Sequence, residues 1–593
     1  MKVDDTGAVW DPVVLAGHFQ SVAEQSQKLM LRFLSRQPDD GHLGIGDASV
    51  LGGAFLDLMT KMMNDPAPVA AAQIHLFNES LNVWRHAAER MLNLPSEDAA
   101  LPKDKRFSHS DWSKNATFSF IRESYLVASK SLLSMVRGVK DLDPATARKV
   151  DFYTRQFVDA MSPTNFIATN PEVLSATLNT GGENLLRGLE HVLADLDRGD
   201  GRLAIAMTDT NAFRFGENIA STPGKVIFQN ELLQLIQYTP TTPEVRRRPL
   251  LIVMPWINKY YVLDLQPKNS FIKWAVDQGH TVFVTSWVNP DEKLAQETFE
   301  DYMSHGLIAA FDAVEAATGE HSLNLIGYCL GGTILAATLA YLAAQGDNRV
   351  ASATYFVTLI DFTEVGDMGV FIDDDQISSV EKRMQEHGYL DAADMAMSFN
   401  MLRANDLIWS FVVNNYLLGK DPVPFDLLYW NADATRMPAV MHSYYMRNMY
   451  QKNLLKEPGG ITLAGTPIDI AKVKTPSFLL SCREDHLAPW KSTYVATQIY
   501  SGPVTFVLAA SGHLAGVISP PGSKYGHWTN DKLPASPDEW FAGAEAQKGS
   551  WWPYWDKWVT QYDGGRVPAR TPGDGKLKVI EDAPGSYVRV RAV

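Results

Sequence analysis

The stretch Leu325-Ile326-Gly327-Tyr328-Cys329-Leu330-Gly331-Gly332 places one cysteine among glycines, directly after a strand-like run. A helix-like run, 333–344, follows it without a break. A nucleophile on such a turn is held in a strained backbone conformation, and glycines are needed where a side chain would clash. The helix N-terminus also adds unpaired N–H groups and partial positive charge, which favour a thiolate and a developing oxyanion. We therefore predict that Cys329 is a nucleophile, although most free cysteines are simply buried.

The composition indicates a large globular protein. The chain has 593 residues, 46% of them hydrophobic and 20% charged, which is too long for one ordinary core. Two cysteines in this length favour a reducing compartment. A net charge of -15 disfavours nucleic acid as a partner. Because the N-terminus lacks a signal-peptide pattern and no apolar run could span a membrane, we expect a soluble cytoplasmic protein.

The first 200 residues have helical periodicity and form the first predicted domain. Apolar residues recur three and four positions apart, as on one face of a helix. Three such stripes are Phe19, Val22, Leu29 and Phe33; Ile74, Phe77, Leu81, Trp84, Ala88 and Met91; and Tyr125, Leu132 and Val136. We expect residues 1–200 to be all-helical, with the stripes packed on each other or on the next domain.

From about residue 220 the pattern changes to short apolar runs that alternate with helix-like stretches. Besides the run before Cys329, they are 225–229, 232–238, 250–254, 281–285, 354–359, 477–480 and 504–508. Near-continuous apolar strands separated by helices are typical of a mostly parallel sheet covered on both faces. Together with the cysteine turn, this predicts an α/β-hydrolase fold for residues 201–593.

A long interruption, about 362–470, separates two strands that this fold would place side by side. It is rich in aromatic residues and partly helical, and a structureless loop of this length is rare in a compact domain. We therefore expect a helical cap over the active site. Asp373-Asp374-Asp375 lies inside it and lacks the ligand spacing of a calcium loop, so we interpret it as an exposed acidic turn.

The acid and the histidine of an α/β-hydrolase follow the nucleophile in that order, each at the C-terminal end of a strand. Asp485 follows the run 477–480, and His513 follows the run 504–508 at a turn. Glu484 is a competing acid and His486 a competing base. We predict Asp485 and His513, because a histidine after a Gly at a turn can reach back over the sheet.

No motif points to a cofactor or a metal. Cys482 lacks the glycine turn and is predicted to be a packed thiol. No spacing of histidines and cysteines is typical of zinc, and Gly573-Asp574-Gly575-Lys576 lacks the preceding strand of a phosphate loop. We expect no cofactor and no metal.

Several long stretches resemble the polyhydroxyalkanoate synthases. They include Gly327-Tyr328-Cys329-Leu330-Gly331-Gly332, 255–265, Ser162-Pro163-Thr164-Asn165-Phe166, 414–420, Gly549-Ser550-Trp551-Trp552-Pro553 and Glu581-Asp582-Ala583-Pro584-Gly585. The resemblance runs from about residue 70 to the end of the chain. A single-subunit chain with a helical N-terminal domain is similar to the class I enzymes; class II enzymes share much of the pattern. Two positions depart from the family pattern: the stretch 286–291 lacks a charged residue before Asn289-Pro290-Asp291, and Trp256 is an unusual choice. These departures weaken any inference about the length of the substrate side chain.

The resemblance implies a substrate, a location and partners. Class I enzymes polymerise short-chain (R)-3-hydroxyacyl-CoA, such as 3-hydroxybutyryl-CoA, with release of CoA, whereas class II enzymes take medium chains. It also implies a homodimer in the cytoplasm at the surface of polyester granules, with granule-coat proteins as candidate partners. For Asp485 the family leaves two roles open: orienting His513, or helping to deprotonate the attacking 3-hydroxyl group.

A cysteine nucleophile suits this chemistry. A serine would take the acyl group as an oxygen ester, which transfers poorly to another hydroxyl, whereas a cysteine exchanges one thioester for another. His513 would take the thiol proton and assist the departure of CoA. The backbone N–H of Leu330 and one from the segment after the strand 250–254, for which we predict Ile257, would hold the oxyanion. Such a donor contributes about 3 kcal/mol.

Two other functions compete. A cysteine-type thioesterase or polyester depolymerase would use the same triad with water as the acceptor, and the large aromatic cap argues against it because it should exclude water. A non-catalytic granule-coat protein could retain the fold. The intact Cys329, Asp485 and His513 argue against that alternative.

Overall fold

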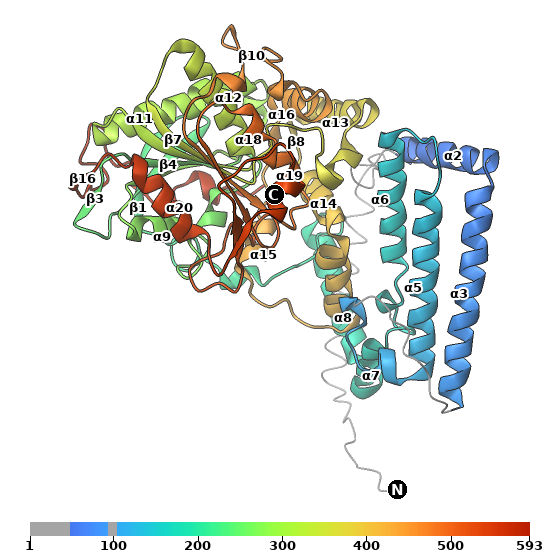
Figure 1. Ribbon diagram of the computed structural model, residues 1–593. Coiled ribbons are helices and arrows are strands. Elements are labelled where there is room, and N and C mark those ends of the chain that lie inside the picture. Colours follow the sequence, from blue (N-terminus) through green and yellow to red (C-terminus); the bar gives the residue numbers. More distant parts are fainter. Residues whose placement is uncertain (1–47, 93–103, 593) are drawn as a thin grey trace. The chain divides into compact units, whose positions relative to one another are not determined.

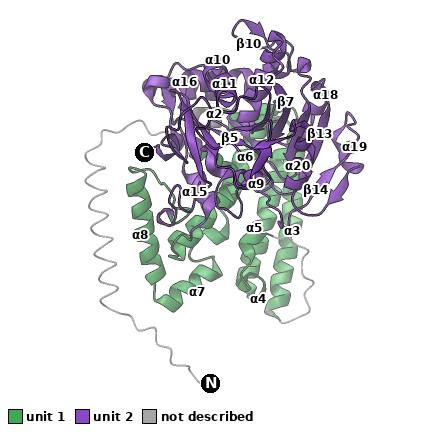
Figure 2. Cartoon of the chain, turned by 90° about the vertical axis from the view of Figure 1, so that its left-hand side faces the viewer, with its two compact units in different colours: residues 1–209, 397–423 green, residues 210–396, 424–593 purple. Residues whose placement is uncertain are grey.

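The computed structural model describes residues 48–92 and 104–592. The chain divides into two compact units (Figure 2). The helical unit comprises residues 1–209 and 397–423, and the sheet unit comprises residues 210–396 and 424–593. The predicted stripe that begins at Phe19 lies outside the described residues. Among those residues, no helix is both long enough and apolar enough to cross a membrane.

The described N-terminal part of the chain is helical, which confirms the predicted fold class for this region (Figure 1). Its helices are α2 (Ala48–Asn64), α3 (Ala67–Met91), α4 (Asp111–Lys114), α5 (Ala116–Arg137), α6 (Pro144–Ala160), α7 (Pro171–Thr180) and α8 (Glu183–Arg198). Side-chain caps fix where several of them begin. Asn115, Asp143 and Asn170 each accept hydrogen bonds from backbone N–H groups of the first turn.

Most of the apolar stripe on α3 does not pack as expected, although Trp84 contacts Phe120 of α5 with ring centroids 4.8 Å apart. Ile74, Phe77, Leu81 and Trp84 are 63%, 64%, 52% and 64% exposed. The face of α3 that is buried carries smaller side chains such as Val83 and Ala87. Arg90 of α3 forms an ion pair of 2.5 Å with the buried Glu123 of α5, next to which α3 lies. Small side chains allow close packing of two helices, so the packed face is the less apolar one.

The sheet unit is built on one sheet of 11 strands in the order β15-β14-β13-β12-β7-β6-β4-β5-β2-β1-β17. Its central strands β5, β4, β6, β7, β12 and β13 are parallel to their neighbours within this set. The strands are β1 (Gly224–Gln229), β2 (Leu233–Tyr238), β4 (Leu250–Val253), β5 (Val282–Trp287), β6 (Leu323–Tyr328), β7 (Val350–Phe356), β12 (Ser477–Cys482), β13 (Val504–Ala509), β14 (His527–Thr529), β15 (Glu545–Gln547) and β17 (Glu581–Asp582). This confirms the predicted α/β class.

Helices lie on both sides of the sheet (Figure 1). They include α9 (Phe271–Asp277), α11 (Ala309–Thr318), α12 (Leu330–Gln345) and α20 (Trp552–Val559). Trp552 and Trp555 of α20 pack against Phe271 of α9 with ring centroids 5.1 and 5.3 Å apart. Both tryptophans are at most 1% exposed, so these C-terminal aromatic residues belong to the core.

The insertion between β7 and β12 contains α13 (Asp374–His387), α14 (Ala392–Leu402), α15 (Asp426–Ala432) and α16 (Ala439–Tyr445). The insertion is divided between the two units: residues 397–423 belong to the helical unit and the rest belongs to the sheet unit. Polar contacts account for this: Tyr416 Oη donates to Asp195 Oδ2 at 2.6 Å, and Asn184 Nδ2 donates to Leu417 O at 2.7 Å. Asp373 is the N-cap of α13, where it accepts a hydrogen bond from Gln376 N.

Candidate active site

Cys329 sits on the sharp turn between β6 and α12, with φ 51° and ψ -119°. A side chain at any of the neighbouring glycines would clash. A Cβ on Gly327 would lie 2.5 Å from Cα of Gly332, a Cβ on Gly331 would overlap the carbonyl of Val253, and a Cβ on Gly332 would overlap Thr358. The glycines are therefore required for close approach of the backbones, as the sequence predicted.

The predicted acid and base meet at the ends of two neighbouring strands. Asp485 lies three residues beyond β12 and His513 lies four residues beyond β13. His513 Nδ1 and Asp485 Oδ2 are 2.7 Å apart, and both residues are buried. The other carboxylate oxygen of Asp485 accepts hydrogen bonds of 2.9 Å from the backbone N–H groups of Leu487 and Ala488. Both oxygens of Asp485 are thus engaged, which fixes the carboxylate against the imidazole.

The imidazole of His513 also contacts the cysteine. Burial alone would lower the pKa of His513, but the charges of Asp485 and Cys329 and hydrogen bonds to both side chains raise it to about 10. The site therefore favours a protonated imidazole between the carboxylate of Asp485 and the sulfur of Cys329. The structure brings the three predicted residues Cys329, Asp485 and His513 together.

The competing residues occupy different surroundings. Of Glu484, Asp485 and His486, it is Asp485 whose carboxylate contacts His513, whereas Glu484 is exposed. Cys482 ends β12 and is fully buried, and burial raises the pKa of its thiol. It is a packed thiol, in agreement with the prediction.

The two candidate oxyanion donors lie on adjoining segments. Leu330 is the first residue of α12, and Ile257 lies four residues beyond β4. Close contact of Gly331 with the carbonyl of Val253 brings the start of α12 against the end of β4. The backbone N–H groups of a helix N-terminus and of a neighbouring loop are a common source of oxyanion stabilisation.

Sequence reasoning missed two tyrosines of the cap. Burial raises the pKa values of Tyr445 and Tyr450, and the charge of Cys329 raises both further, so both tyrosines are within electrostatic range of the cysteine. The two rings are perpendicular, with centroids 5.3 Å apart. The sequence showed that residues 362–470 are rich in aromatic residues, but periodicity cannot tell which of their rings approach Cys329.

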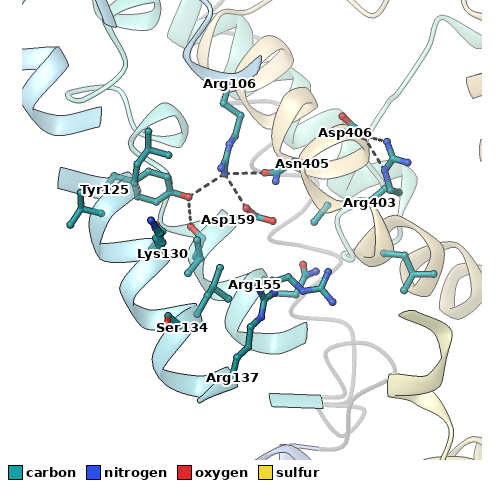
Figure 3. A pocket seen from close by; sticks show the side chains of 18 of the residues that line it. Arg106, Tyr125, Lys130, Ser134, Arg137, Arg155, Asp159, Arg403, Asn405 and Asp406 are labelled. Carbon is teal, nitrogen blue, oxygen red and sulfur yellow. Dashed lines mark hydrogen bonds and ion pairs between the residues drawn. The ribbon is translucent and has the colours of Figure 1, made fainter. Parts of the chain in front are cut away.

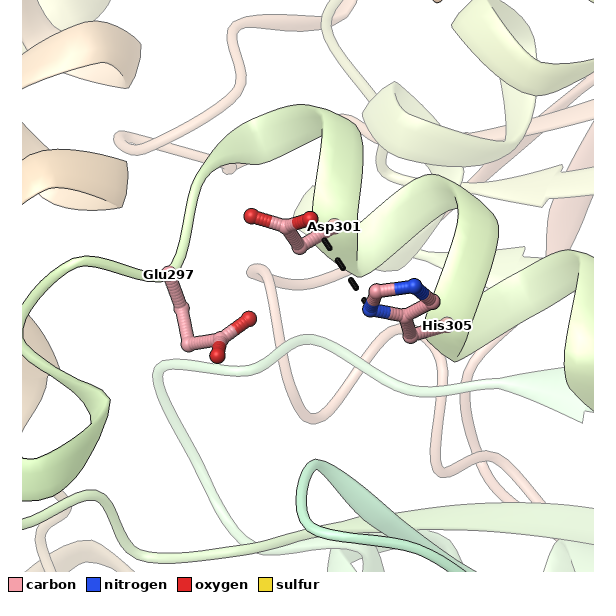
Figure 4. A group of neighbouring side chains, drawn as sticks. All are labelled: Glu297, Asp301 and His305. Atoms are coloured by element: carbon pink, nitrogen blue, oxygen red, sulfur yellow. Dashed lines mark ion pairs between the residues drawn. The ribbon is translucent and has the colours of Figure 1, made fainter.

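Among the described residues, one group of acidic and histidine side chains is close enough to hold a metal ion (Figure 4). The candidate ligand atoms of Glu297, Asp301 and His305 lie within 4.8 Å of one another. Asp301 is already engaged: its Oδ2 accepts from the backbone N–H of Thr298 at 2.9 Å in a capping box. This arrangement is accounted for by helix capping and an exposed ion pair between His305 and Asp301.

The helical unit contains a pocket of about 1190 Å³ between α5, α6 and residues 402–406 (Figure 3). Arg106 forms ion pairs with Asp104 at 2.8 Å and Asp159 at 3.0 Å. Arg403 is paired with Asp406 in the same wall. The guanidinium groups are thus neutralised by neighbouring carboxylates, which argues for a structural role of this polar cluster.

Comparisons with known proteins agree with the fold and show the family of the chain. Residues 103–275 match the family described as poly-beta-hydroxybutyrate polymerase (PhaC) N-terminus, and residues 259–520 match the alpha/beta hydrolase fold family. The chain is 51% identical to the poly(3-hydroxyalkanoate) polymerase subunit PhaC of Rhizobium meliloti, over 89% of this chain and 87% of that protein. It is 49% identical to the poly(3-hydroxyalkanoate) polymerase of Methylorubrum extorquens, over 92% of each chain. It is 41% identical to the PhaC subunit of Cupriavidus necator, over 93% of each. With this identity over nearly its whole length, the chain belongs to the poly(3-hydroxyalkanoate) polymerase family.

Proposed function

We propose that the protein polymerises short-chain (R)-3-hydroxyacyl-CoA, such as 3-hydroxybutyryl-CoA, into polyhydroxyalkanoate with release of CoA. The growing acyl group is carried as a thioester on Cys329. The observation that supports this most directly is the contact of His513 with both Asp485 and Cys329 at the strand ends of an α/β-hydrolase sheet. The scheme uses side chains and backbone N–H groups of the chain together with the CoA thioester, and we propose no cofactor or metal in it.

In the acylation step, His513 takes the thiol proton and the Cys329 thiolate attacks the thioester carbonyl. The raised pKa of His513 supports this, because the imidazole then holds the proton it has taken. The carbonyl oxygen becomes an oxyanion held by the backbone N–H groups of Leu330 and Ile257. The C–S bond to CoA then breaks, and the imidazolium returns the proton to the departing thiolate.

In the elongation step, the 3-hydroxyl group of an acyl unit attacks a thioester carbonyl and forms the ester bond of the polymer. The C–S bond of that thioester breaks, and His513 takes the hydroxyl proton and passes it to the released thiolate. For Asp485 we propose the orienting role. Its Oδ2 lies 2.7 Å from Nδ1 of His513, and its Oδ1 accepts two backbone N–H groups. A carboxylate held on both oxygens supports an imidazole better than it reaches a substrate hydroxyl.

The aromatic cap favours transfer over hydrolysis. His513 is 7% exposed and Asp485 8% exposed, and Tyr445 and Tyr450 are within electrostatic range of Cys329. Limited access of water to an activated thioester favours a hydroxyl acceptor from substrate over free water. A thioesterase or depolymerase needs water at the thioester, and the enclosure of the site disfavours that.

The insoluble product suggests where the protein works. We propose that it acts as a cytoplasmic homodimer at the surface of polyester granules, where granule-coat proteins are candidate partners. Membership of the family supports this placement.

The deciding experiment incubates the purified protein with (R)-3-hydroxyacyl-CoA substrates of increasing acyl length. We expect release of CoA together with insoluble polymer, fastest with the short substrates. Release of CoA with free hydroxy acid as the product would instead establish a thioesterase. Cys329→Ser is the finer variant: it should acylate weakly and fail to elongate, because an oxygen ester is a poor acyl donor.

A further inference from the structure

The segment that carries Ile257 is anchored at both ends. At its start, the carbonyl of Met254 accepts a hydrogen bond of 2.7 Å from Trp287 Nε1 of β5. At its end, the carbonyl of Lys259 accepts a hydrogen bond of 2.7 Å from Trp430 Nε1 of the cap helix α15. The backbone between these anchors therefore has little freedom to move.

The side chain of Lys259 provides a stronger anchor. It is 3% exposed, and its Nζ donates to the carbonyl oxygens of Val588 at 2.7 Å and Val590 at 2.6 Å. Asp433 Oδ1 lies 3.0 Å from the same nitrogen. Burial lowers the pKa of Lys259, while the charge of Asp433 opposes this. The ammonium is thus enclosed by two carbonyls of the C-terminal tail and one carboxylate of the cap.

The carboxylate of Asp433 links this cage to the same loop again. Its Oδ2 accepts a hydrogen bond of 2.9 Å from Tyr261 Oη. Asp433 immediately follows α15, and Arg591 of the tail donates to Tyr429 Oη of α15 at 2.6 Å. Three parts of the chain that are distant in sequence are therefore joined around one buried ammonium.

A buried ammonium is costly, since desolvation takes several kcal/mol unless partners offset it. Here the partners are present, and removal of the ammonium alone would leave the carboxylate of Asp433 and the carbonyls of Val588 and Val590 without this donor. The three acceptors surround the ammonium of Lys259 in fixed directions. The charged side chain therefore defines where the loop after β4 must lie.

We propose that Lys259 is a positioning residue for the reaction. Its ammonium ties the loop after β4 to the C-terminal tail and so holds the N–H of Ile257 where the thioester oxygen becomes negative. The tail, although it is remote in sequence from every residue of the triad, thereby sets the rate of acylation. This inference rests on the proposed function, which assigns the oxyanion to that N–H.

The test compares Lys259→Met, which keeps the apolar stem, with Lys259→Arg, which keeps the charge. Lys225→Met is the matched control, because Lys225 pairs with Asp582 of the C-terminal region at 2.5 Å on the surface. We expect Lys259→Met to slow the first release of CoA about tenfold or more, the scale of a misplaced catalytic group. Lys259→Arg should recover part of the loss, and Lys225→Met should acylate at the wild-type rate.

Alkylation of Cys329 by iodoacetamide separates positioning from general damage. In that reaction the sulfur displaces iodide from a saturated carbon, so no carbonyl oxyanion forms. A positioning role requires Lys259→Met to lose acylation while the alkylation rate stays at the wild-type value. Parallel loss of both rates would overturn the inference, and so would wild-type acylation by Lys259→Met.

Hydrogen exchange of the backbone gives a readout that does not depend on activity. We expect faster exchange in residues 254–263 of Lys259→Met and of a chain that ends at Tyr587, with no further increase when the two changes are combined. Unchanged exchange in Lys259→Met would overturn the inference. Failure of the proposed function would show separately, as absence of an acyl adduct on Cys329 in the wild-type protein.

Discussion

Cys329 and Cys482 both lie at the C-terminal end of a strand in the same sheet, and only β7 separates the two strands. Cys482 continues its strand, is fully buried and has a thiol pKa raised by that burial. Cys329 is turned out of its strand at φ 51°, is only partly buried, and contacts His513. We expect the Cys482 thiol to be inert and the Cys329 thiol to be reactive, because the backbone turn and the neighbouring base differ between the two sites.

We expect the largest effect from replacing each of the two cysteines by alanine. Cys329→Ala should abolish CoA release with little change in the free energy of unfolding, because the side chain is only partly buried. Cys482→Ala should retain activity and cost about 1 kcal/mol through the small cavity it leaves. Assays of CoA release and chemical denaturation measure both effects. Substantial activity in Cys329→Ala would break the comparison at once.

Removal of the base should make Cys329 behave more like Cys482. We expect His513→Gln to suppress the first release of CoA and to slow alkylation of Cys329 at neutral pH, because no imidazolium then lies beside the sulfur. Intact mass after timed exposure to iodoacetamide measures the second effect. Unaltered alkylation would mean that His513 does not activate the thiol.

The raised pKa of His513 also has a consequence for stability. A folded-state pKa of about 10, above the ordinary value of 6.5, means that the protonated imidazole stabilises the folded state fully below about pH 6.5. This contribution should be lost as the pH rises towards 10. The difference in unfolding free energy between the wild type and His513→Gln should therefore shrink over that interval. A difference that stayed constant would contradict the assigned ion pair.

Asp485→Asn should have a smaller effect than removal of the base. If Asp485 orients the imidazole, the first acylation and all later steps should slow together, by up to about 10⁴-fold as for comparable triads. Intact mass distinguishes the other role: a rapid first release of CoA followed by a trapped acyl-enzyme would assign Asp485 to the 3-hydroxyl group. Glu484→Gln is the matched control, and it should remain active.

The smallest expected effect concerns the cap. Tyr445→Ala should leave acylation of Cys329 nearly intact and shift part of the product from polymer to free hydroxy acid, because water gains access to the thioester. Tyr445→Phe keeps the ring and should retain the wild-type ratio of products. Quantifying polymer and free acid per CoA released tests this. An unchanged ratio of polymer to free acid in Tyr445→Ala would show that this side chain does not keep water from the thioester.

The sequence was sufficient to predict which residues meet at the strand ends. The order of Cys329, Asp485 and His513 follows the order of apolar runs, and the parallel sheet brings the ends of those runs together. The packing of α3 was not predictable in the same way. Periodicity identified Phe77 and Trp84 as one face but could not show that the neighbouring face with Val83 and Ala87 is the buried one.

The cage around Lys259 was also beyond sequence reasoning. It joins residues separated by more than 300 positions, and two of the acceptors are backbone carbonyls, which carry no signal in the sequence. The partition of the insertion was missed for a related reason. Tyr416 has an aromatic ring that suits either unit, and only its hydrogen bond to Asp195 shows where it belongs.

The division of the insertion has a consequence for synthesis of the protein. The chain leaves the helical unit after residue 209, returns to it at 397 and leaves again after 423. When the first 209 residues have been translated, Tyr416, the hydrogen-bond partner of the buried Asp195, has not yet been made. The helical unit is completed only after β1 to β7 have been translated. Its final folding thus waits for most of the sheet, and no single cut in the polypeptide yields either unit intact.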